Sequence, residues 1–409
     1  MKSSIWESKF SSRTERMSSS AIRELLKLAA RPEVISFGGG MPAPELFPRE
    51  EIVAATERVL KTTESANQAL QYGTTEGLPA LREWIANFMS KDGLKVDPDN
   101  ILITSGSQQA LDLLGKILID ENDYIVVENP TYLCALQAWS PYGADYATVP
   151  MDQDGMIVEA LEGAFVKNPK FIYALSNFQN PTGVSLSYER RQKLVEMSTK
   201  YQVPIVEDDP YGALCFEAKP TPSLLAIESA YKNELKGDPS NVVYLSTFSK
   251  ILTPGMRLAW VVAPSKVINK MVQAKQGMDL HTTTFAQCVT YEVARTGFLD
   301  EHIQKIIECY RRRRDVMLES LEENMPVNKG ITWTHPQGGL FLWITLPEHL
   351  DATELMKESL KDNVSFVPGN SFFPLGGGHN TMRLNFSYMP DEKINEGIGR
   401  LGNVIKRMI

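Results

Sequence analysis

The chain has 409 residues, of which 43% are hydrophobic and 22% charged, a composition typical of a globular protein with room for two lobes. Its formal net charge of −8 disfavours a nucleic-acid partner, whose phosphates require a basic surface. The polar start lacks the apolar stretch of a secretory signal, and no apolar run approaches the roughly 20 residues that span a bilayer. The four cysteines form no CxxC pair, so neither a zinc site nor a disulfide framework is expected. A cytoplasmic protein is the default expectation.

Short apolar runs rich in β-branched residues recur along the chain and predict buried strands. These runs span residues 101–104, 124–127, 170–175, 203–207, 241–245 and 258–263. Helical patterns fill many of the gaps, for example YERRQKLVEMSTKY at 188–201. Strands that alternate with helices predict a mostly parallel sheet.

The pattern changes from about residue 290 onward. A long helical stretch, which contains the basic run RRRR at 311–314, leads to strand-like runs within 330–347 and 381–387. We expect a smaller α+β lobe here. For the arginine run, a solvated helix face or an intersubunit salt-bridge patch is favoured over nucleic-acid binding.

Polar or aromatic side chains follow five of the predicted strands. In an open α/β sheet, ligands collect at the carboxyl ends of the strands, so these side chains are expected to share one edge. Each segment alone fits a plain turn or a helix cap, and the five together indicate a binding site. The segments are SGSQQ at 105–109, ENPTY at 128–132, SNFQNPTG at 176–183, DDPY at 208–211 and STFSKILTPGMR at 246–257.

Taken in order, these segments resemble the fold-type I pyridoxal-phosphate (PLP)-dependent aminotransferases, and most of all the branch of 2-aminoadipate and kynurenine aminotransferases. The resemblance extends through ISFGGGMPAPELFP at 35–48, QYGTTEGLPALR at 71–82, FVPGNSFF at 366–373 and TMRLNFS at 381–387, and so covers essentially the whole chain. It implies an α/β fold with a mostly parallel seven-stranded sheet in a large domain and a smaller α+β domain. It also implies a homodimer with pyridoxal 5′-phosphate at the junction of lobes and subunits.

The domain boundaries expected from this resemblance and from the change of pattern are as follows. Residues 1–50 form an N-terminal segment that contributes to the small domain and covers the active site. Residues 51–295 form the large PLP-binding domain, and residues 296–409 form the small domain.

The chemistry of the coenzyme requires an amine that holds its aldehyde and later moves the α-proton of the substrate. A lysine can do both if burial or a cationic neighbour lowers its pKa from about 10.4. Lys250 follows a buried strand and has Arg257 seven residues further on, so we expect Lys250 to be the catalytic lysine. The alternative is an ordinary lysine on a surface loop.

The coenzyme phosphate requires hydrogen-bond donors and positive charge. Ser107 and Gln108 lie at a predicted helix N-terminus, where free backbone N–H groups favour an anion. Arg257 can form a charge-assisted pair with the same phosphate. The hydroxyl groups of Thr247 and Ser249 are further expected donors; at Thr247 the family often has serine.

The pyridine ring requires a carboxylate that keeps its nitrogen protonated. We expect Asp208 rather than Asp209 in this role, because the D-x-x-Y spacing to Tyr211 matches the family. Asn180 and Tyr211 are expected to bind the 3′-oxygen of the ring. Tyr132 is expected to stack on its face.

Tyr72 matches the tyrosine that reaches the phosphate of the neighbouring subunit in this family, with plain interface packing as the alternative. For the α-carboxylate of the substrate we expect Arg383, an otherwise unexplained charge in a predicted strand. Its alternative is a strand-edge arginine that faces solvent. Asn180 is expected to contact the substrate too, and Gly39 and Gly40 are expected to let the backbone approach it closely.

Arg23 lies on the predicted amphipathic helix SSSAIRELLKLAA at 18–30. If that helix folds over the site, Arg23 reaches a distal carboxylate of the substrate; otherwise it faces solvent.

The expected function is transfer of an amino group between an L-amino acid and 2-oxoglutarate by a ping-pong reaction. Donors are expected to include 2-aminoadipate, aromatic and branched-chain amino acids. A PLP-dependent lyase or decarboxylase on the same fold is one alternative. A non-enzymatic PLP-binding regulator is less favoured, because only about 35 residues precede the SFGGG motif and leave no room for a winged helix.

Overall fold

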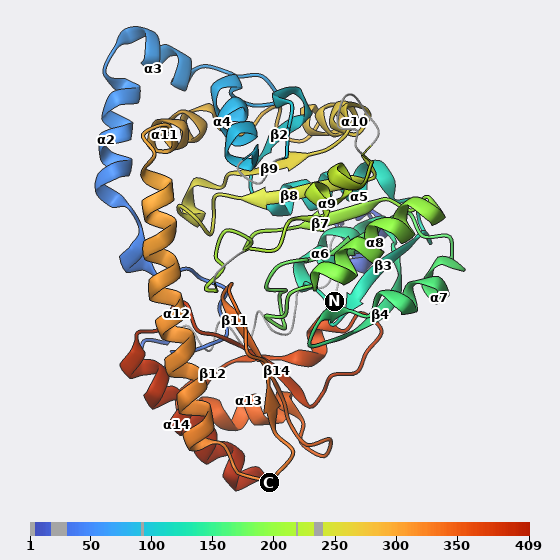
Figure 1. The fold of residues 1–409 in the computed structure, drawn as a ribbon, viewed down its shortest axis with the longest axis vertical. Helices are drawn as coiled ribbons and strands as arrows, with labels where there is room; N and C mark the ends of the chain where they lie inside the picture. Colours follow the sequence, from blue (N-terminus) through green and yellow to red (C-terminus); the bar gives the residue numbers. More distant parts are fainter. Residues whose placement is uncertain (1–4, 18–30, 91–93, 218–219, 233–239) are drawn as a thin grey trace.

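The computed structural model describes residues 5–17, 31–90, 94–217, 220–232 and 240–409. Two sheets lie one above the other in Figure 1, and the long helix α12 (Phe298–Asn324) runs beside both of them. Arg23 and the predicted helix at 18–30 lie outside the described residues. No helix within the described ranges is both long and apolar enough to cross a membrane.

The larger sheet has the strand order β2-β9-β8-β7-β6-β3-β4-β5. Parallel pairs join β8, β7, β6, β3 and β4, and β9 runs antiparallel to both of its neighbours. The sequence pattern predicted a mostly parallel sheet, and the family resemblance implied seven strands. In the described residues the sheet has an eighth, because the two-residue strand β5 (Gly155–Met156) folds back on the end of β4 (Asp145–Asp152).

Each of the six predicted runs overlaps a strand, and β4 had no counterpart among them. The six strands are β2 (Ile101–Thr104), β3 (Tyr124–Asn129), β6 (Ile172–Ala174), β7 (Ile205–Asp208), β8 (Val242–Thr247) and β9 (Ala259–Val262). Every residue of β2, β6, β7, β8 and β9 is buried, which fits the apolar character of most of their residues.

Helices cover both faces of this sheet. Successive side chains of a strand point to opposite faces, so Ile205 packs into one hydrophobic cluster and Val206 into the other. The cluster with Val206 includes residues of α5 (Ser107–Leu118), α6 (Leu133–Trp139) and α10 (Ser265–Gln276). The cluster with Ile205 includes residues of α2 (Arg49–Leu60), α3 (Thr63–Leu70), α4 (Pro79–Met89), α7 (Leu161–Phe165), α8 (Tyr188–Tyr201), α9 (Leu224–Lys232) and α11 (Thr284–Ala294).

The smaller sheet is antiparallel, in the order β10-β11-β14-β13. The first part of the chain joins this region, because β1 pairs in parallel with β12. The elements are β1 (Ile35–Ser36), β10 (Thr332–Trp333), β11 (Phe341–Thr345), α13 (Ala352–Lys361), β12 (Val364–Ser365), β13 (Val367–Pro368), β14 (Thr381–Asn385) and α14 (Asp391–Met408).

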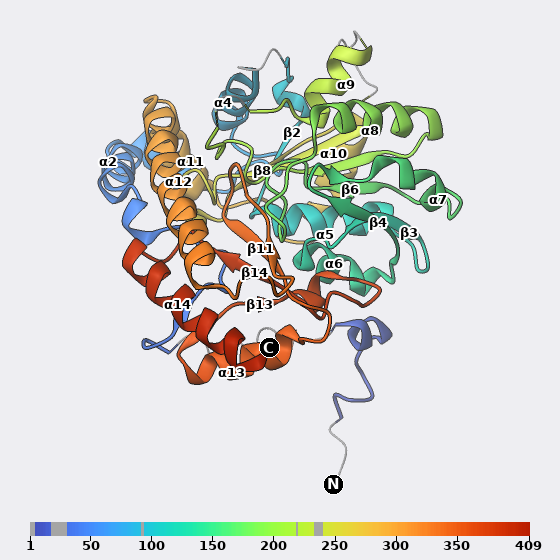
Figure 2. The ribbon, with the colours of Figure 1, turned by 60° about the horizontal axis from the view of Figure 1, so that its bottom comes forward.

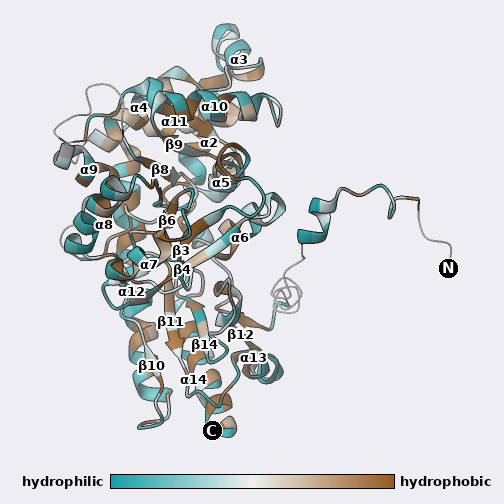
Figure 3. Ribbon diagram, turned by 90° about the vertical axis from the view of Figure 1, so that its right-hand side faces the viewer, coloured by the Kyte–Doolittle hydropathy of each residue, from teal (hydrophilic) through white to brown (hydrophobic). Residues whose placement is uncertain are grey.

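The arginine run lies on α12, and its side chains hold this helix to neighbouring segments. Arg313 is 3% exposed and donates to the carbonyl oxygen of Ser387, and Arg314 donates to that of Pro336 over 2.8 Å. These contacts lie within one chain, so the expected solvated face or intersubunit patch does not describe Arg313 or Arg314. At the other end, residues 5–17 project from the body as an arm (Figures 2 and 3), with Arg16 paired to Glu121 at its base.

Candidate active site

A cavity of about 340 Å³ opens beyond the carboxyl ends of the parallel strands. The structure brings most of the expected site residues to its wall, from segments that are far apart in sequence. These residues are Gly40, Ser107, Gln108, Tyr132, Asn180, Asp208, Tyr211, Thr247, Ser249, Lys250, Arg257 and Arg383. The shared location follows from the parallel strands, whose carboxyl ends meet at one edge of the sheet.

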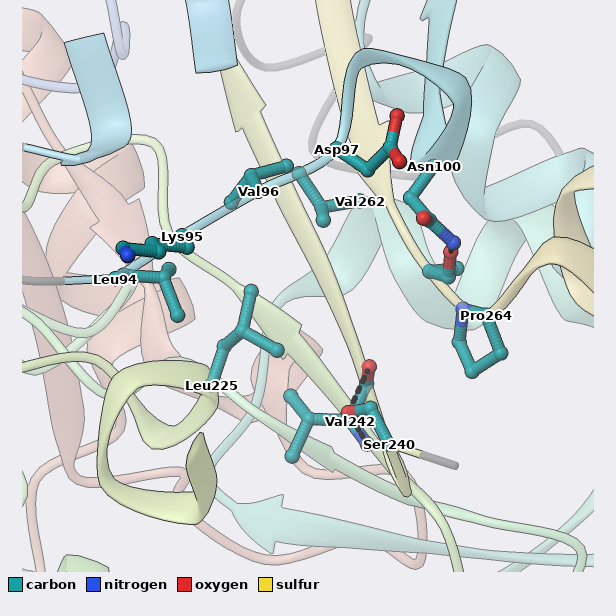
Figure 4. A pocket seen from close by; sticks show the side chains of 11 residues that line it. Leu94, Lys95, Val96, Asp97, Asn100, Leu225, Ser240, Val242, Val262 and Pro264 are labelled. Atoms are coloured by element: carbon teal, nitrogen blue, oxygen red, sulfur yellow. Dashed lines mark hydrogen bonds between the residues drawn. The ribbon is translucent and has the colours of Figure 1, made fainter. Parts of the chain in front are cut away.

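A second hollow, of about 130 Å³, lies at the other ends of the strands, beside the start of β8 and the end of β9 (Figure 4). Its wall is formed mainly by apolar side chains such as Leu225 and Val262, and the hydroxyl of Ser240 is bonded to the backbone of Val242. No expected site residue lines this hollow.

Lys250 follows β8, and its amino group reaches into the larger cavity. The Nζ atom donates a hydrogen bond of 2.9 Å to the carbonyl oxygen of Gly40. Burial lowers the pKa of Lys250 to about 8, and the charges of Arg383 and Arg257 act in the same direction. A large fraction of this amine is therefore neutral, and so nucleophilic, in mildly alkaline solution.

The helix α5 and Arg257 form one end of the cavity. Gly106, at the N-cap of α5, has φ +83°, and a Cβ atom there would lie 2.3 Å from Nη2 of Arg257. The glycine thus allows the guanidinium to close on the helix N-terminus. The buried hydroxyl of Ser107 has no partner among the described residues, while Thr247 donates to Ser249 over 2.9 Å. Free donors, helix dipole and arginine together make an anion site.

Two neighbouring aspartates have different surroundings. Asp209 accepts hydrogen bonds from the backbone of Gly212 at 2.8 Å and from Tyr244 at 3.0 Å. Asp208 accepts one from Tyr173 at 2.7 Å through Oδ2, and its buried Oδ1 has no partner among the described residues. Burial raises the pKa of Asp208 to about 7, against the opposing effect of the Tyr173 hydrogen bond. Asp208, rather than Asp209, has an acceptor available in the cavity.

Arg383 lies on β14 at the other end and is only 8% exposed, so it is not an arginine that faces solvent. Its Nη1 donates to Oδ1 of Asn180 at 2.7 Å and its Nη2 to the carbonyl oxygen of Gly38 at 2.8 Å. Its guanidinium lies 4.2 Å from the centre of the Phe341 ring. Burial lowers the pKa of Arg383 to about 10, so the side chain is a cation at neutral pH.

Two of the expected site residues that the structure describes, Tyr72 and Gly39, are not on the cavity wall. Tyr72 is 78% exposed and packs edge-on against His281 with ring centres 5.8 Å apart. Gly39 lies beside Met41, and Arg23 is outside the described residues.

Three residues at the site were not predicted from the sequence: Cys134, Phe341 and Tyr173. Cys134 and Phe341 line the cavity, and Tyr173 binds Asp208. For Cys134, the signal in the sequence was its position two residues after Tyr132. For Tyr173 the signal was its place on the strand next to that of Asp208.

Comparison with known proteins decides the family. The aminotransferase class I and II family matches residues 33–401. The chain belongs to this family. It is 45% identical to aromatic-amino-acid aminotransferase 1 of Thermococcus litoralis, over 98% of this chain and 95% of that protein. The multiple substrate aminotransferase of Thermococcus profundus has a TM-score of 0.91 and 45% identity, with 99% of each chain covered. The α-aminoadipate aminotransferase of Thermus thermophilus, complexed with N-(5′-phosphopyridoxyl)-L-leucine, has a TM-score of 0.89 and 40% identity over 98% of each chain.

The protein is thus a PLP-dependent aminotransferase of fold type I, and its cavity fits the coenzyme. An anion site at one end suits a phosphate, a lysine amine lies beside it, and Oδ1 of Asp208 is a free acceptor. When bound, pyridoxal phosphate supplies an electron-withdrawing ring that stabilises negative charge at the α-carbon of the substrate. In the described part of the aminotransferase, no cluster of His, Cys, Asp and Glu suits a metal ion.

Proposed function

We propose that this aminotransferase moves an amino group from an L-amino acid to 2-oxoglutarate by a ping-pong mechanism. Donors would include 2-aminoadipate, aromatic and branched-chain amino acids. The observation that carries the proposal is a pair of cations from two different sheets on the wall of one cavity, Arg257 after β8 and Arg383 on β14, whose charges both act on Lys250. Three relatives are named for action on aromatic amino acids, on multiple substrates and on α-aminoadipate. These names support a broad range of donors.

Each residue of the cavity then has a role. The phosphate of the coenzyme would be held by Ser107, Gln108, Thr247, Ser249 and Arg257. Asp208 would keep the ring nitrogen protonated, Tyr132 would stack on the ring, and Asn180 and Tyr211 would bind its 3′-oxygen. This assignment rests on the location of these side chains along one cavity wall.

The remaining roles concern the substrate. Arg383 binds the α-carboxylate by exchanging its hydrogen bonds to Asn180 and the Gly38 carbonyl for bonds to the substrate. The neutral amine of Lys250 would take up the α-proton of the substrate and hold it for return. Gly40 lets the Phe341 ring, which also lines the cavity, pack close to the backbone, because a Cβ atom at Gly40 would lie 3.1 Å from that ring.

A homodimer completes the proposed site. Tyr72 is exposed in the single chain, as are Leu70 and Leu280, which are 71% and 49% exposed. Burial of these apolar side chains against a second copy would be favourable, and Tyr72 would then reach the phosphate in the partner subunit. We also propose that the enzyme works in the cytoplasm, and that residues 1–50, 51–295 and 296–409 form its segments and domains as expected from the sequence.

The experiment that tests the proposed reaction is a panel of amino donors incubated with 2-oxoglutarate. We expect glutamate and the matching 2-oxo acid in equal amounts. A lyase or decarboxylase would consume the donor without glutamate formation, and carbon dioxide release would identify the decarboxylase.

A further inference from the structure

Tyr173 and Asp208 lie on neighbouring parallel strands in a register that brings their side chains together. Tyr173 on β6 is directly opposite Val206 on β7, and both side chains belong to the same hydrophobic cluster. Asp208 is two residues after Val206 and therefore points to the same face. Because strand side chains lean along the strand, the tyrosine hydroxyl reaches Oδ2 of Asp208 at 2.7 Å.

The tyrosine is itself fixed. It is fully buried, and Trp139 packs edge-on against its ring with centres 5.0 Å apart. The indole N–H of Trp139 donates to the carbonyl oxygen of Leu111 on α5 over 2.9 Å. The hydroxyl of Tyr173 therefore has little freedom to turn away from Asp208.

One oxygen of Asp208 is thus held, while the other, Oδ1, is buried at the cavity without a partner among the described residues. We propose that Tyr173 is a positioning residue, which fixes the Asp208 carboxylate so that its free oxygen meets the ring nitrogen of the coenzyme. The inference rests on the role proposed above for Asp208.

The charges around Asp208 explain why such a donor is needed. Burial disfavours the ionised form of Asp208 most strongly, and the charge of Asp209 acts in the same direction. Tyr132 and Tyr211 are buried neighbours: burial raises the pKa of each, and the charge of Asp208 adds to the rise. The hydrogen bond of Tyr173 opposes these effects and favours the carboxylate.

The neighbouring aspartate provides a matched control. Tyr244 on β8 is directly opposite Glu207 on β7, and its hydroxyl reaches Oδ2 of Asp209, two residues further on, over 3.0 Å. Tyr244→Phe removes the same group from the same kind of contact, on the other face of the sheet and away from Asp208.

The test compares the Kd of pyridoxal 5′-phosphate with the Kd of its 1-deaza analogue, in which a C–H group replaces the ring nitrogen. Binding to the coenzyme-free protein is followed by fluorescence quenching, so no turnover is needed. The discrimination ratio is the Kd of the analogue divided by the Kd of the coenzyme. We expect Tyr173→Phe to lower this ratio by about tenfold, the effect of losing a hydrogen bond to a charged group, and Tyr244→Phe to leave it unchanged.

A double-mutant cycle separates the two claims. Asp208→Asn should bring the ratio close to one, and Tyr173→Phe in that background should change it no further. If Asp208→Asn leaves the ratio at its wild-type value, the proposed role of Asp208 fails. If Asp208→Asn lowers the ratio and Tyr173→Phe does not, only the inference about Tyr173 is overturned.

Equal weakening of both ligands by Tyr173→Phe would also overturn the inference, because it would indicate a general packing role. Phenylalanine fills the same space as tyrosine, so circular dichroism should show a native fold. If it does not, Tyr173→Leu, which also lacks a donor, is measured in its place with the same outcomes.

Discussion

The amino group of Lys250 donates to the carbonyl oxygen of Gly40, 210 residues earlier in the chain, over 2.9 Å. Arg383 makes the same kind of contact with the carbonyl oxygen of Gly38 at 2.8 Å. Both cations near the proposed substrate position therefore hold the triple-glycine segment at 38–40. Coenzyme and substrate would compete with the carbonyl oxygens of this segment for the two cations. Binding in the cavity would therefore affect the backbone at 38–40.

The buried amine should make the coenzyme-free protein less stable at neutral pH. The pKa of Lys250 is lowered to about 8 in the folded chain from an ordinary value of 10.5. The loss of stability caused by the buried charge is complete below pH 8, where the amine is charged in both the folded and the unfolded chain. It disappears as the pH rises to 10.5, the ordinary pKa of the amine in the unfolded chain. Lys250→Met should therefore raise stability by about 2–3 kcal/mol at pH 7 and by little at pH 10.5.

Urea unfolding of the coenzyme-free protein at the two pH values measures this difference. Lys116→Met is the control, because Lys116 is exposed at the end of α5. A gain in stability that is the same at both pH values would show that the methionine side chain, and not the charge, is responsible.

The anion site should depend on Gly106 as well as on Arg257. An alanine at 106 would place its Cβ 2.3 Å from Nη2 of Arg257 in a backbone conformation with φ +83°. Gly106→Ala and Arg257→Ala should each raise the Kd of pyridoxal phosphate by about tenfold or more, because a charged hydrogen bond is lost. Neither should change the Kd of pyridoxal, which has no phosphate.

Gly163→Ala is the matched control, since nothing lies within 4 Å of an added Cβ atom there. Equal losses for pyridoxal and its phosphate in the Gly106 and Arg257 variants would place the anion site elsewhere.

The two aspartates should separate turnover from stability. Asp208→Asn removes the charge beside the proposed ring position and should lower kcat by about 100-fold or more. Asp209→Asn weakens the acceptor for Tyr244 and for the backbone of Gly212, so it should lower Tm while kcat stays within a few-fold of wild type. Steady-state kinetics and thermal unfolding on both variants check this, and the reverse pattern would mean that Asp209 serves the ring.

Most of the fold followed from apolar runs and from what comes after them. Strands buried on both faces, such as β9, read as continuous hydrophobic stretches and were predicted within a few residues. The strand β4 was missed because its burial alternates and its sequence, DYATVPMD, contains a proline and two aspartates. The short strand β5 depends on pairing with β4, which no local pattern reveals.

The site was predicted mostly by resemblance and by strand-end chemistry, and its failures have physical causes. In the sequence only the spacing to Tyr211, which matches the family, separated Asp208 from Asp209, and the hydrogen bonds of the fold add a physical difference between them. Tyr173 looked like a core residue because its contact depends on the register of two strands. The arginine run looked like a surface feature, although Arg313 is almost fully buried.

Substrate choice should depend on Arg23. A fixed cation in the pocket would be left unpaired against an apolar side chain, which is costly when buried, so we expect Arg23 to contact only dicarboxylic substrates. Arg23→Ala should raise KM for glutamate and 2-aminoadipate by an amount that corresponds to about 1–3 kcal/mol. KM for leucine and phenylalanine should hardly change. Equal rises for both classes would indicate that Arg23 supports the fold instead.

The central claim is that Lys250 carries the coenzyme, and covalent trapping tests it most directly. Borohydride reduction of the yellow holoenzyme, proteolysis and mass spectrometry should find a pyridoxyl group on the peptide that contains Lys250. Lys250→Ala should give no labelled peptide and at most a trace of transamination. A pyridoxyl group on another lysine of the wild-type protein, with Lys250 unmodified, would contradict the account.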